Sequence, residues 1–354
     1  MRRNWKKLLA GLIVLVLVVA FFVPLPYYVT RPGSADKLDP LVSVEGYSSN
    51  GKGVFRLVTI AMGQANIYSY LAAKVLPYQE LEKESDVRGE NETDEEYNVR
   101  QLSLMNQSKN NAIQVAYKAA GKSVKVEYRG VYVLSVMPDA PAAKYLAAGD
   151  LITAIDGKSF ASSAEFIKYV RSKKVGDKVE VSYKHEDKSE KASIELIDID
   201  KKGTPGIGIS LVDDQKLVTD PKIKIDSDKI GGPSAGLMFT LEIYNHFGDT
   251  DWTKGRNIAG TGTIDVEGNV GRIGGIDQKI VAADRADAEI FFAPDDTVTA
   301  ELKKVEPGAV SNYEEAVKTA KAIDSKMKVV PVKTFQDALD YLKTVKAKKN
   351  EKNP

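Results

Sequence analysis

The sequence contains no cysteine and only two histidines among its 354 residues. Without cysteine the chain can form no disulfide, no zinc–thiolate site and no cysteine nucleophile. Histidine-based catalysis has only His185 and His246 to draw on. His185 lies in the charged stretch KHEDKSEK, which is typical of a solvated surface, and His246 follows the apolar run LEIYN, which favours a histidine at a helix end. Neither context indicates a catalytic histidine.

An excess of either charge is also lacking, because 50 Lys and Arg residues balance 49 Asp and Glu residues for a formal net charge of +1. A nearly neutral chain has little attraction for phosphate backbones, so the sequence predicts no nucleic-acid partner. The phosphate-loop pattern G-x-x-x-x-G-K-[ST] is missing too. The sequence predicts no cofactor and no metal ion. Its longest acidic stretch, YQELEKESDVRGENETDEEYNVRQ, indicates a solvated helix face or loop, or else a surface that attracts a basic substrate.

One long hydrophobic run is present, where MRRNWKK is followed by LLAGLIVLVLVVAFFVPLPYYV. About 22 uncharged residues at ~1.5 Å per residue are enough to cross the ~30 Å hydrocarbon layer. Basic residues precede the run and only Arg31 follows closely, so the positive-inside rule places residues 1–7 in the cytoplasm and the rest of the chain outside the cell membrane. We expect an uncleaved single-pass anchor over residues 8–29. The alternative is a cleaved signal peptide, although the run is long for one and no clean A-x-A site follows.

Residues 30–124 form a linker and an N-terminal extracellular segment. The linker is rich in turn residues, and GVFRLVTIAM at 53–62 has the composition of a strand. Residues 66–76 and 101–120 show helical patterns. The sequence leaves open whether this segment stands apart or supplies early strands of the C-terminal domain. In the second case the intervening domain is an insertion.

Residues 125–200 contain short strands and one amphipathic helix. VKVEY, GVYVLSV, LITAI and KVEVSY have strand patterns, and AEFIKYVRSKK has an apolar helical face. This order resembles a PDZ domain, whose backbone N–H groups hold a peptide's C-terminal carboxylate while a strand edge pairs with the peptide. The alternative is a small α+β domain without a ligand. The resemblance implies that the peptide-binding residues are Arg129, Gly130, Val131, Tyr132 and Val133.

Strands and helices alternate over residues 206–347, where KIGGPSAGLMFT raises the question of a reactive serine. A serine hydroxyl is a weak nucleophile until a base removes its proton. Because cysteine is absent and neither histidine is well placed, the remaining common base is a lysine made neutral by burial or by another cation. Lys279 follows a Gly-Gly turn at the start of an apolar helix, where the helix dipole opposes its protonation. Ser234 also opens a helix, beside glycines that allow close backbone approach.

The motifs G-P-S-A-G, T-G-T-I and I-G-G-x-x-x-K, in this order, resemble the proteolytic domain of the Lon family. The resemblance implies a Ser-Lys dyad, with Ser234 as nucleophile and Lys279 as general base. It further implies that Thr261 holds the lysine amine and that the backbone N–H groups of Gly231 and Ser234 form the oxyanion hole. Thr263 replaces a common glutamate and Gly231 an acidic residue, which alters the electrostatics of the site. The alternatives are a helix N-cap for Ser234 and a solvated surface position for Lys279.

The complete arrangement resembles the membrane-anchored, PDZ-containing Lon-like serine peptidases of Gram-positive bacteria. This resemblance implies an α+β fold with an N-terminal transmembrane helix, a PDZ-like domain at 125–200 and a Lon-type protease domain at 206–347. It implies an ATP-independent endopeptidase that cleaves extracellular peptides or unfolded exported proteins selected by the PDZ domain, and a homo-oligomer. The alternative is a catalytically inactive membrane scaffold that binds partner C-termini.

Overall fold

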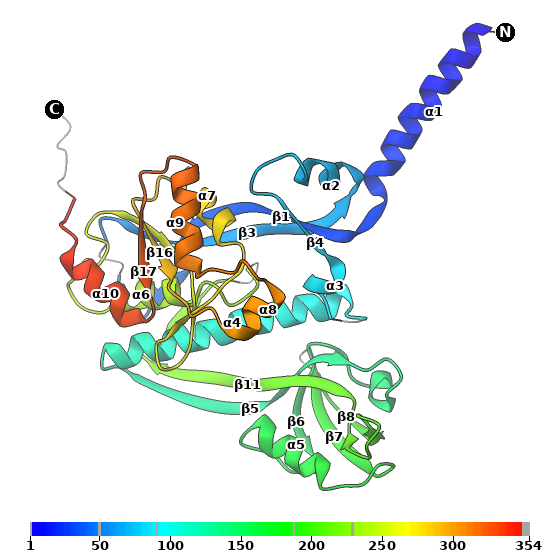
Figure 1. Ribbon diagram of the computed structural model, residues 1–354. Coiled ribbons are helices and arrows are strands. Elements are labelled where there is room, and N and C mark those ends of the chain that lie inside the picture. Colours follow the sequence, from blue (N-terminus) through cyan, green and yellow to red (C-terminus); the bar gives the residue numbers. More distant parts are fainter. Residues whose placement is uncertain (1, 49–50, 90, 187, 228–229, 349–354) are drawn as a thin grey trace.

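The computed structural model describes residues 2–48, 51–89, 91–186, 188–227 and 230–348. Helices and strands are mixed throughout, as the sequence predicts. Figure 1 shows a long N-terminal helix that projects from a body with two parts. One part is built on a six-stranded sheet and the other on a five-stranded sheet. The long helix α4 (Asp94–Ala119) and the ribbon formed by β5 (Ser123–Val136) and β11 (Ile209–Asp220) lie between the two parts (Figure 1).

Helix α1 (Arg2–Phe22) contains most of the hydrophobic run, and its apolar side chains are exposed. Its length and composition suffice to cross a membrane, although a signal sequence would pass the same test. The helix ends before residue 29, the expected end of the anchor, because strand β1 (Pro24–Lys37) begins at a proline. Proline has no N–H to donate, so Pro24 and Pro26 cannot continue the helix.

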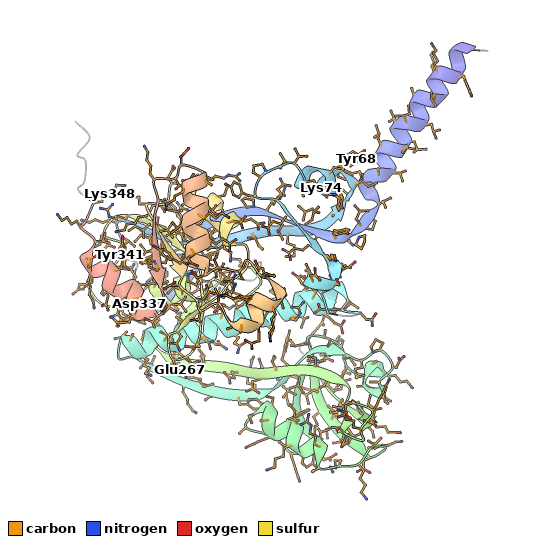
Figure 2. The ribbon with its side chains drawn as sticks, in the orientation of Figure 1. Tyr68, Lys74, Glu267, Asp337, Tyr341 and Lys348 are labelled. Atoms are coloured by element: carbon orange, nitrogen blue, oxygen red, sulfur yellow. The ribbon has the colours of Figure 1, made fainter. Side chains whose placement is uncertain are left out.

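The short helix α2 (Ile67–Ala73) lies beside the end of α1. The Tyr68 hydroxyl donates a hydrogen bond of 2.6 Å to the Leu17 carbonyl, and the Tyr68 ring contacts that of Phe21. Figure 2 shows Tyr68 at the junction of the two helices. Asn66 and Ser69 form a reciprocal capping box that fixes the start of α2.

Strands from both ends of the chain form one sheet, in the order β17-β16-β13-β3-β1-β4. β3 pairs antiparallel with β1 and parallel with β13. Three of these strands precede the five-stranded sheet in the sequence and three follow it, so the chain leaves this sheet and later returns to it. The strands are β1, β3 (Val54–Asn66), β4 (Glu80–Lys83), β13 (Asn257–Gly260), β16 (Ile290–Pro294) and β17 (Lys328–Val332).

Helices cover both faces of this sheet. Neighbouring residues of β16 point to opposite faces of the sheet. Phe292 packs in the core around α6, and Phe291 packs in the core around α7. Nearly every residue of α6 is buried, as expected for a helix that is apolar on all sides. The helices of this part are α3 (Glu84–Val87), α4 (Asp94–Ala119), α6 (Gly236–His246), α7 (Ile276–Arg285), α8 (Ala300–Val305), α9 (Asn312–Ala322) and α10 (Phe335–Thr344).

The second sheet has the strand order β11-β5-β6-β7-β8, and α5 (Ser163–Arg171) packs Phe166 and Val170 into its core. The sheet extends beyond residue 200, the expected end of this domain, because β11 pairs with β5 along its whole length. Charged and polar residues in LVDDQKLVTD hide the strand pattern of β11. The strands are β5 (Ser123–Val136), β6 (Leu151–Ile155), β7 (Lys178–His185), β8 (Lys188–Glu195) and β11 (Ile209–Asp220).

Short strand pairs tie the two parts together and close local turns. β12 pairs with β2, and so links the end of the second sheet's ribbon to the loop after β1. β9 pairs with β10, and β14 pairs with β15. These elements are β2 (Val42–Val44), the 3-10 helix η1 (Pro141–Lys144), β9 (Ile197–Asp198), β10 (Pro205–Gly206), β12 (Ile223–Ile225), β14 (Thr263–Ile264) and β15 (Val270–Gly271).

Candidate active site

A cleft of about 990 Å³ lies where α4, β1 and β3 meet the loop before α6. Ser234 and Lys279 both line it, together with Gly231 and Thr263. The structure therefore brings together residues that lie far apart in the sequence and that the Lon resemblance selects. Clefts of this kind, with a few convergent polar groups, are the usual form of an active site.

Ser234 lies two residues before α6, whose N-cap is Ala235. No side-chain hydrogen bond caps this helix, so the N-cap interpretation of Ser234 is wrong. The loop is fixed instead by α4, because the Gly232 N–H donates to the Gln101 carbonyl at 3.0 Å and the Ser108 hydroxyl donates to the Pro233 carbonyl at 2.8 Å. Ser234 is thus free of a capping role and is held at the rim of the cleft.

Lys279 lies in the first turn of α7, and only 3% of its surface is exposed. Burial lowers the pKa of its amine from 10.5 to about 7, because a charged ammonium loses its hydration there. Within the described residues no carboxylate forms an ion pair with Lys279. The solvated-surface interpretation of Lys279 is therefore wrong. An amine with this pKa is partly neutral near pH 7, as a general base must be.

Thr261 connects the lysine to the serine segment. Its hydroxyl accepts a hydrogen bond from the Lys279 amine at 3.3 Å and donates one to the Ser234 carbonyl at 3.0 Å. Thr261 follows directly after β13 and is 1% exposed, so its position is set by the central sheet. No hydrogen bond joins the Ser234 hydroxyl directly to the Lys279 amine in the part of the chain that the structure describes. Catalytic contacts often tighten only when substrate binds.

Gly231, the expected oxyanion-hole residue, lies against α4. A Cβ at this position would lie 3.0 Å from the Cβ of Gln101, closer than side chains normally approach. This contact gives a physical reason for glycine where Lon proteases commonly have an acidic residue. Gly232 has a φ of +80°, which favours glycine, and it turns the chain toward Ser234.

The residues expected to bind a peptide in the PDZ domain lie inside strand β5, which is paired on both sides. Val131 pairs with Ile152 on one side and with Asp213 on the other, and Tyr132 and Val133 also pair with β11. A peptide therefore cannot add at Val131–Val133, and that prediction is wrong. Gly130 likewise pairs with Asp214, and the Arg129 side chain forms an ion pair of 2.6 Å with the same aspartate.

β11 is one of the two edge strands of this sheet, the other being β8, and its outer side pairs with no other strand among the described residues. It begins at the last residue of the sequence G-I-G-I (residues 206–209), which our sequence analysis did not single out. Gly208 has a φ of +84°, and a Cβ there would lie 2.7 Å from that of Ala140. Helix α5 lies beside β11, since the Ser163 N–H donates to the Asp213 carboxylate at 2.7 Å. The alternation of glycine and apolar residues at 206–209 was the feature of the sequence that could have indicated this edge strand and the turn before it.

The two histidines lie outside the cleft. His185 is half-exposed and its Nδ1 lies 2.7 Å from an Asp150 oxygen, which raises the pKa of the imidazole. His246 is the last residue of α6, which confirms the predicted helix-end position, and it is buried.

Comparisons with known proteins identify both domains. Residues 119–196 match the PDZ domain family, and residues 226–342 match the Lon protease (S16) C-terminal proteolytic domain. The chain therefore combines a PDZ domain with a Lon-type proteolytic domain. Together these domains support a protease of the serine-peptidase type that binds peptides or proteins.

Individual relatives match parts of the chain. A Lon protease of Campylobacter jejuni is 30% identical over 139 residues, which is 36% of this chain but only 16% of that protein's length. A PDZ domain of an SdrC-like protein from Listeria monocytogenes is 67% identical, covers 25% of this chain and 93% of that structure, and has a TM-score of 0.25. The corresponding domain from Listeria innocua is 68% identical, covers 23% and 92%, and has a TM-score of 0.23.

Proposed function

We propose that this protein is an ATP-independent, membrane-anchored serine endopeptidase that uses Ser234 and Lys279 as a dyad. The observation that carries the proposal is a buried lysine without an ion partner among the described residues, 3.3 Å from the hydroxyl of Thr261. That hydroxyl also holds the Ser234 carbonyl. Burying an unpaired amine is destabilising, so such an arrangement is more consistent with catalysis than with a purely structural role.

In this mechanism the Ser234 hydroxyl attacks the scissile carbonyl carbon while its proton passes to the Lys279 amine. The resulting oxyanion accepts hydrogen bonds from the backbone N–H groups of Gly231 and Ser234. Lys279 then gives the proton to the leaving amine as the peptide C–N bond breaks, which leaves an acyl-enzyme at Ser234. Water releases the acyl group, and Lys279 takes the proton of the water and returns it to Ser234.

The substrate would bind in an extended form along β3. Beyond Leu57, where pairing with β13 ends, β3 pairs only with β1 among the described residues. Thr59, Ile60 and Met62 of this segment line the cleft. An unpaired strand edge beside a nucleophile can bind a peptide through main-chain hydrogen bonds, with side chains giving the preference between sequences.

The PDZ domain would select substrates at the edge of β11. The loop at residues 206–209 would hold a C-terminal carboxylate with its backbone N–H groups, and the peptide would pair with β11 beside α5. We further propose that the PDZ domain is inserted in the protease domain, because β1, β3 and β4 precede it and share a sheet with the strands that follow it. The basic residues at the start of α1 favour a cytoplasmic N-terminus and an extracellular catalytic part.

The test uses the full chain in detergent micelles, because removal of residues up to Thr30 would cut β1. Wild type, Ser234→Ala and Lys279→Ala are incubated with unstructured peptides without ATP, and the products are identified by mass spectrometry. We expect discrete cuts by wild type and none by either variant. Equal cutting by all three would refute the dyad. Peptide binding without cutting by wild type would instead support the inactive scaffold.

A further inference from the structure

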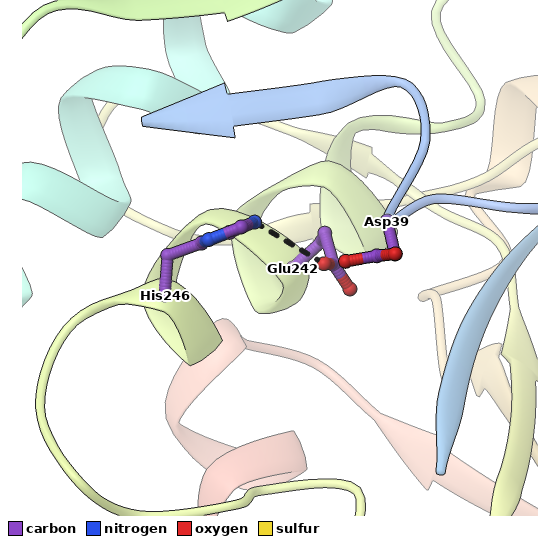
Figure 3. A group of neighbouring side chains, drawn as sticks. All are labelled: Asp39, Glu242 and His246. Carbon is purple, nitrogen blue, oxygen red and sulfur yellow. Dashed lines mark ion pairs between the residues drawn. The ribbon is translucent and has the colours of Figure 1, made fainter. Parts of the chain in front are cut away.

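A cluster of metal-ligand side chains lies at the far end of α6 from Ser234. Glu242 and His246 are one helical turn apart on this helix, and Asp39 belongs to the loop between β1 and β2. Figure 3 shows the Glu242 carboxylate between the His246 ring and the Asp39 carboxylate. One ligand atom from each residue lies within 4.8 Å of those of the other two.

The buried members of this cluster have few partners, since His246 Nε2 and Glu242 Oε1 form an ion pair of 3.4 Å with each other but make no hydrogen bond. The side chains of Glu242 and His246 are only 3% and 4% exposed. Neither ring nitrogen of His246 has a hydrogen bond, and neither does Glu242 Oε1, among the residues that the structure describes. Buried polar atoms without partners are rare in folded proteins, and a bound ion is one established reason for them. No described lysine or arginine forms an ion pair with Asp39 or Glu242, so the two carboxylates have no fixed cation other than a protonated His246.

We propose that Asp39, Glu242 and His246 bind a divalent transition-metal ion of the zinc class. One imidazole and two carboxylates are a donor set that Zn²⁺ accepts, with water as the fourth ligand. In a tetrahedral site with bonds of about 2.0–2.1 Å, neighbouring ligand atoms lie about 3.4 Å apart. The observed separation of His246 Nε2 and Glu242 Oε1 is 3.4 Å. Asp39 is exposed, so its side chain can move to complete the site and solvent can supply the water.

The metal would connect two elements that also form the catalytic cleft. α6 begins two residues after Ser234, and β1 supplies Ser34 and Asp36 to the cleft before it continues to Asp39. A bond from the loop after β1 to the last turn of α6 would stabilise their relative position. The site is distinct from the proposed dyad, so its test does not depend on peptidase activity.

The presence of only two histidines offers a matched control. Purified, untagged full-length protein in detergent is stripped of metal and titrated with Zn²⁺ by isothermal calorimetry, and Co²⁺ loading is followed by its visible absorption. We expect one Zn²⁺ per chain for wild type and for His185→Gln, and loss of that site in His246→Gln. Absence of stoichiometric binding by wild type would overturn the proposal. The same would follow if His185→Gln, not His246→Gln, removed the site.

Asp39→Asn provides a second test, because a change at an exposed side chain should leave the fold intact even if the buried His246→Gln variant fails to fold. We expect Asp39→Asn to weaken Zn²⁺ binding by at least ~10-fold, since the loss of even an outer-sphere partner commonly has that effect. Unfolding temperatures with and without Zn²⁺ should show stabilisation of wild type and much less of Asp39→Asn. Unchanged affinity in Asp39→Asn would overturn the three-residue site.

Discussion

The pH dependence of peptidase activity follows from the burial of Lys279. With a pKa of about 7, about half of these amines are neutral at pH 7, whereas an amine at its ordinary pKa of about 10.5 would be neutral in only about one molecule in three thousand. In the proposed dyad the neutral amine is the base, so we expect kcat/KM to rise about tenfold per pH unit below pH 7 and to level off above it. The measurement is kcat/KM on a fluorogenic peptide from pH 5 to 10. A rate that keeps rising to pH 10 would refute the argument.

The lowered pKa of Lys279 also makes the free energy of unfolding depend on pH. The lowering from 10.5 to about 7 corresponds to at most about 5 kcal/mol, at about 1.4 kcal/mol per pKa unit. Between pH 7 and about 10.5 the unfolded chain binds a proton at this lysine that the folded chain does not, so this contribution to stability becomes more favourable as pH rises through that window. Below pH 7 both states are protonated and the full penalty remains.

Lys279→Met removes this penalty while it keeps a side chain of similar volume. We therefore expect the variant to unfold at a higher temperature than wild type at pH 6, with a difference that shrinks as the pH approaches 10. Ser234→Ala is the control, because it abolishes the proposed chemistry without changing a titrating group. A difference between Lys279→Met and wild type that is the same at every pH would contradict the lowered pKa.

Three further variants test neighbouring parts of the site. Thr261→Val keeps the shape but removes the hydroxyl between Lys279 and the Ser234 carbonyl, so kcat/KM should fall about 10- to 100-fold without unfolding, as measured by peptide hydrolysis and circular dichroism. Gly231→Ala places a Cβ 3.0 Å from Gln101 and should lower kcat more than it raises KM. Gly208→Val should abolish peptide binding by the PDZ domain in fluorescence anisotropy but spare cleavage of short peptides that bind only in the cleft.

The candidate dyad could be predicted from the sequence because its signals are local. Each of Ser234 and Lys279 follows a short glycine-containing turn at the start of a helix, and such turns are visible in a single sequence. The burial that lowers the pKa of Lys279 is not local, since it depends on how α7 packs against β1 and β3. The helix dipole was the cause expected for Lys279, with burial named only in general terms, and burial is the cause of the lowered pKa.

The PDZ edge and the metal-ligand cluster could not be predicted for a different reason. Which of two strands lies at the edge of a sheet depends on pairing between Val131 and Asp213, which lie far apart in the sequence. Asp39 and His246 are even farther apart, and a Glu-x-x-x-His spacing inside an apolar helix carries little information on its own. Only the fold places the loop after β1 against the last turn of α6.

The position of α4 between the two domains limits the kind of substrate that could contact both of them. One side of this helix lines the candidate active-site cleft with Gln101 and Met105, and another side lines a groove of about 720 Å³ beside β11 with Asn106 and Asn110. A helix is about 10–12 Å across with its side chains, and an extended chain covers at most about 3.6 Å per residue. A peptide held at β11 must therefore pass around α4 in an extended form before it reaches Ser234. A tightly folded substrate could not do so without first being unfolded, which is why we propose unstructured chains as the substrates.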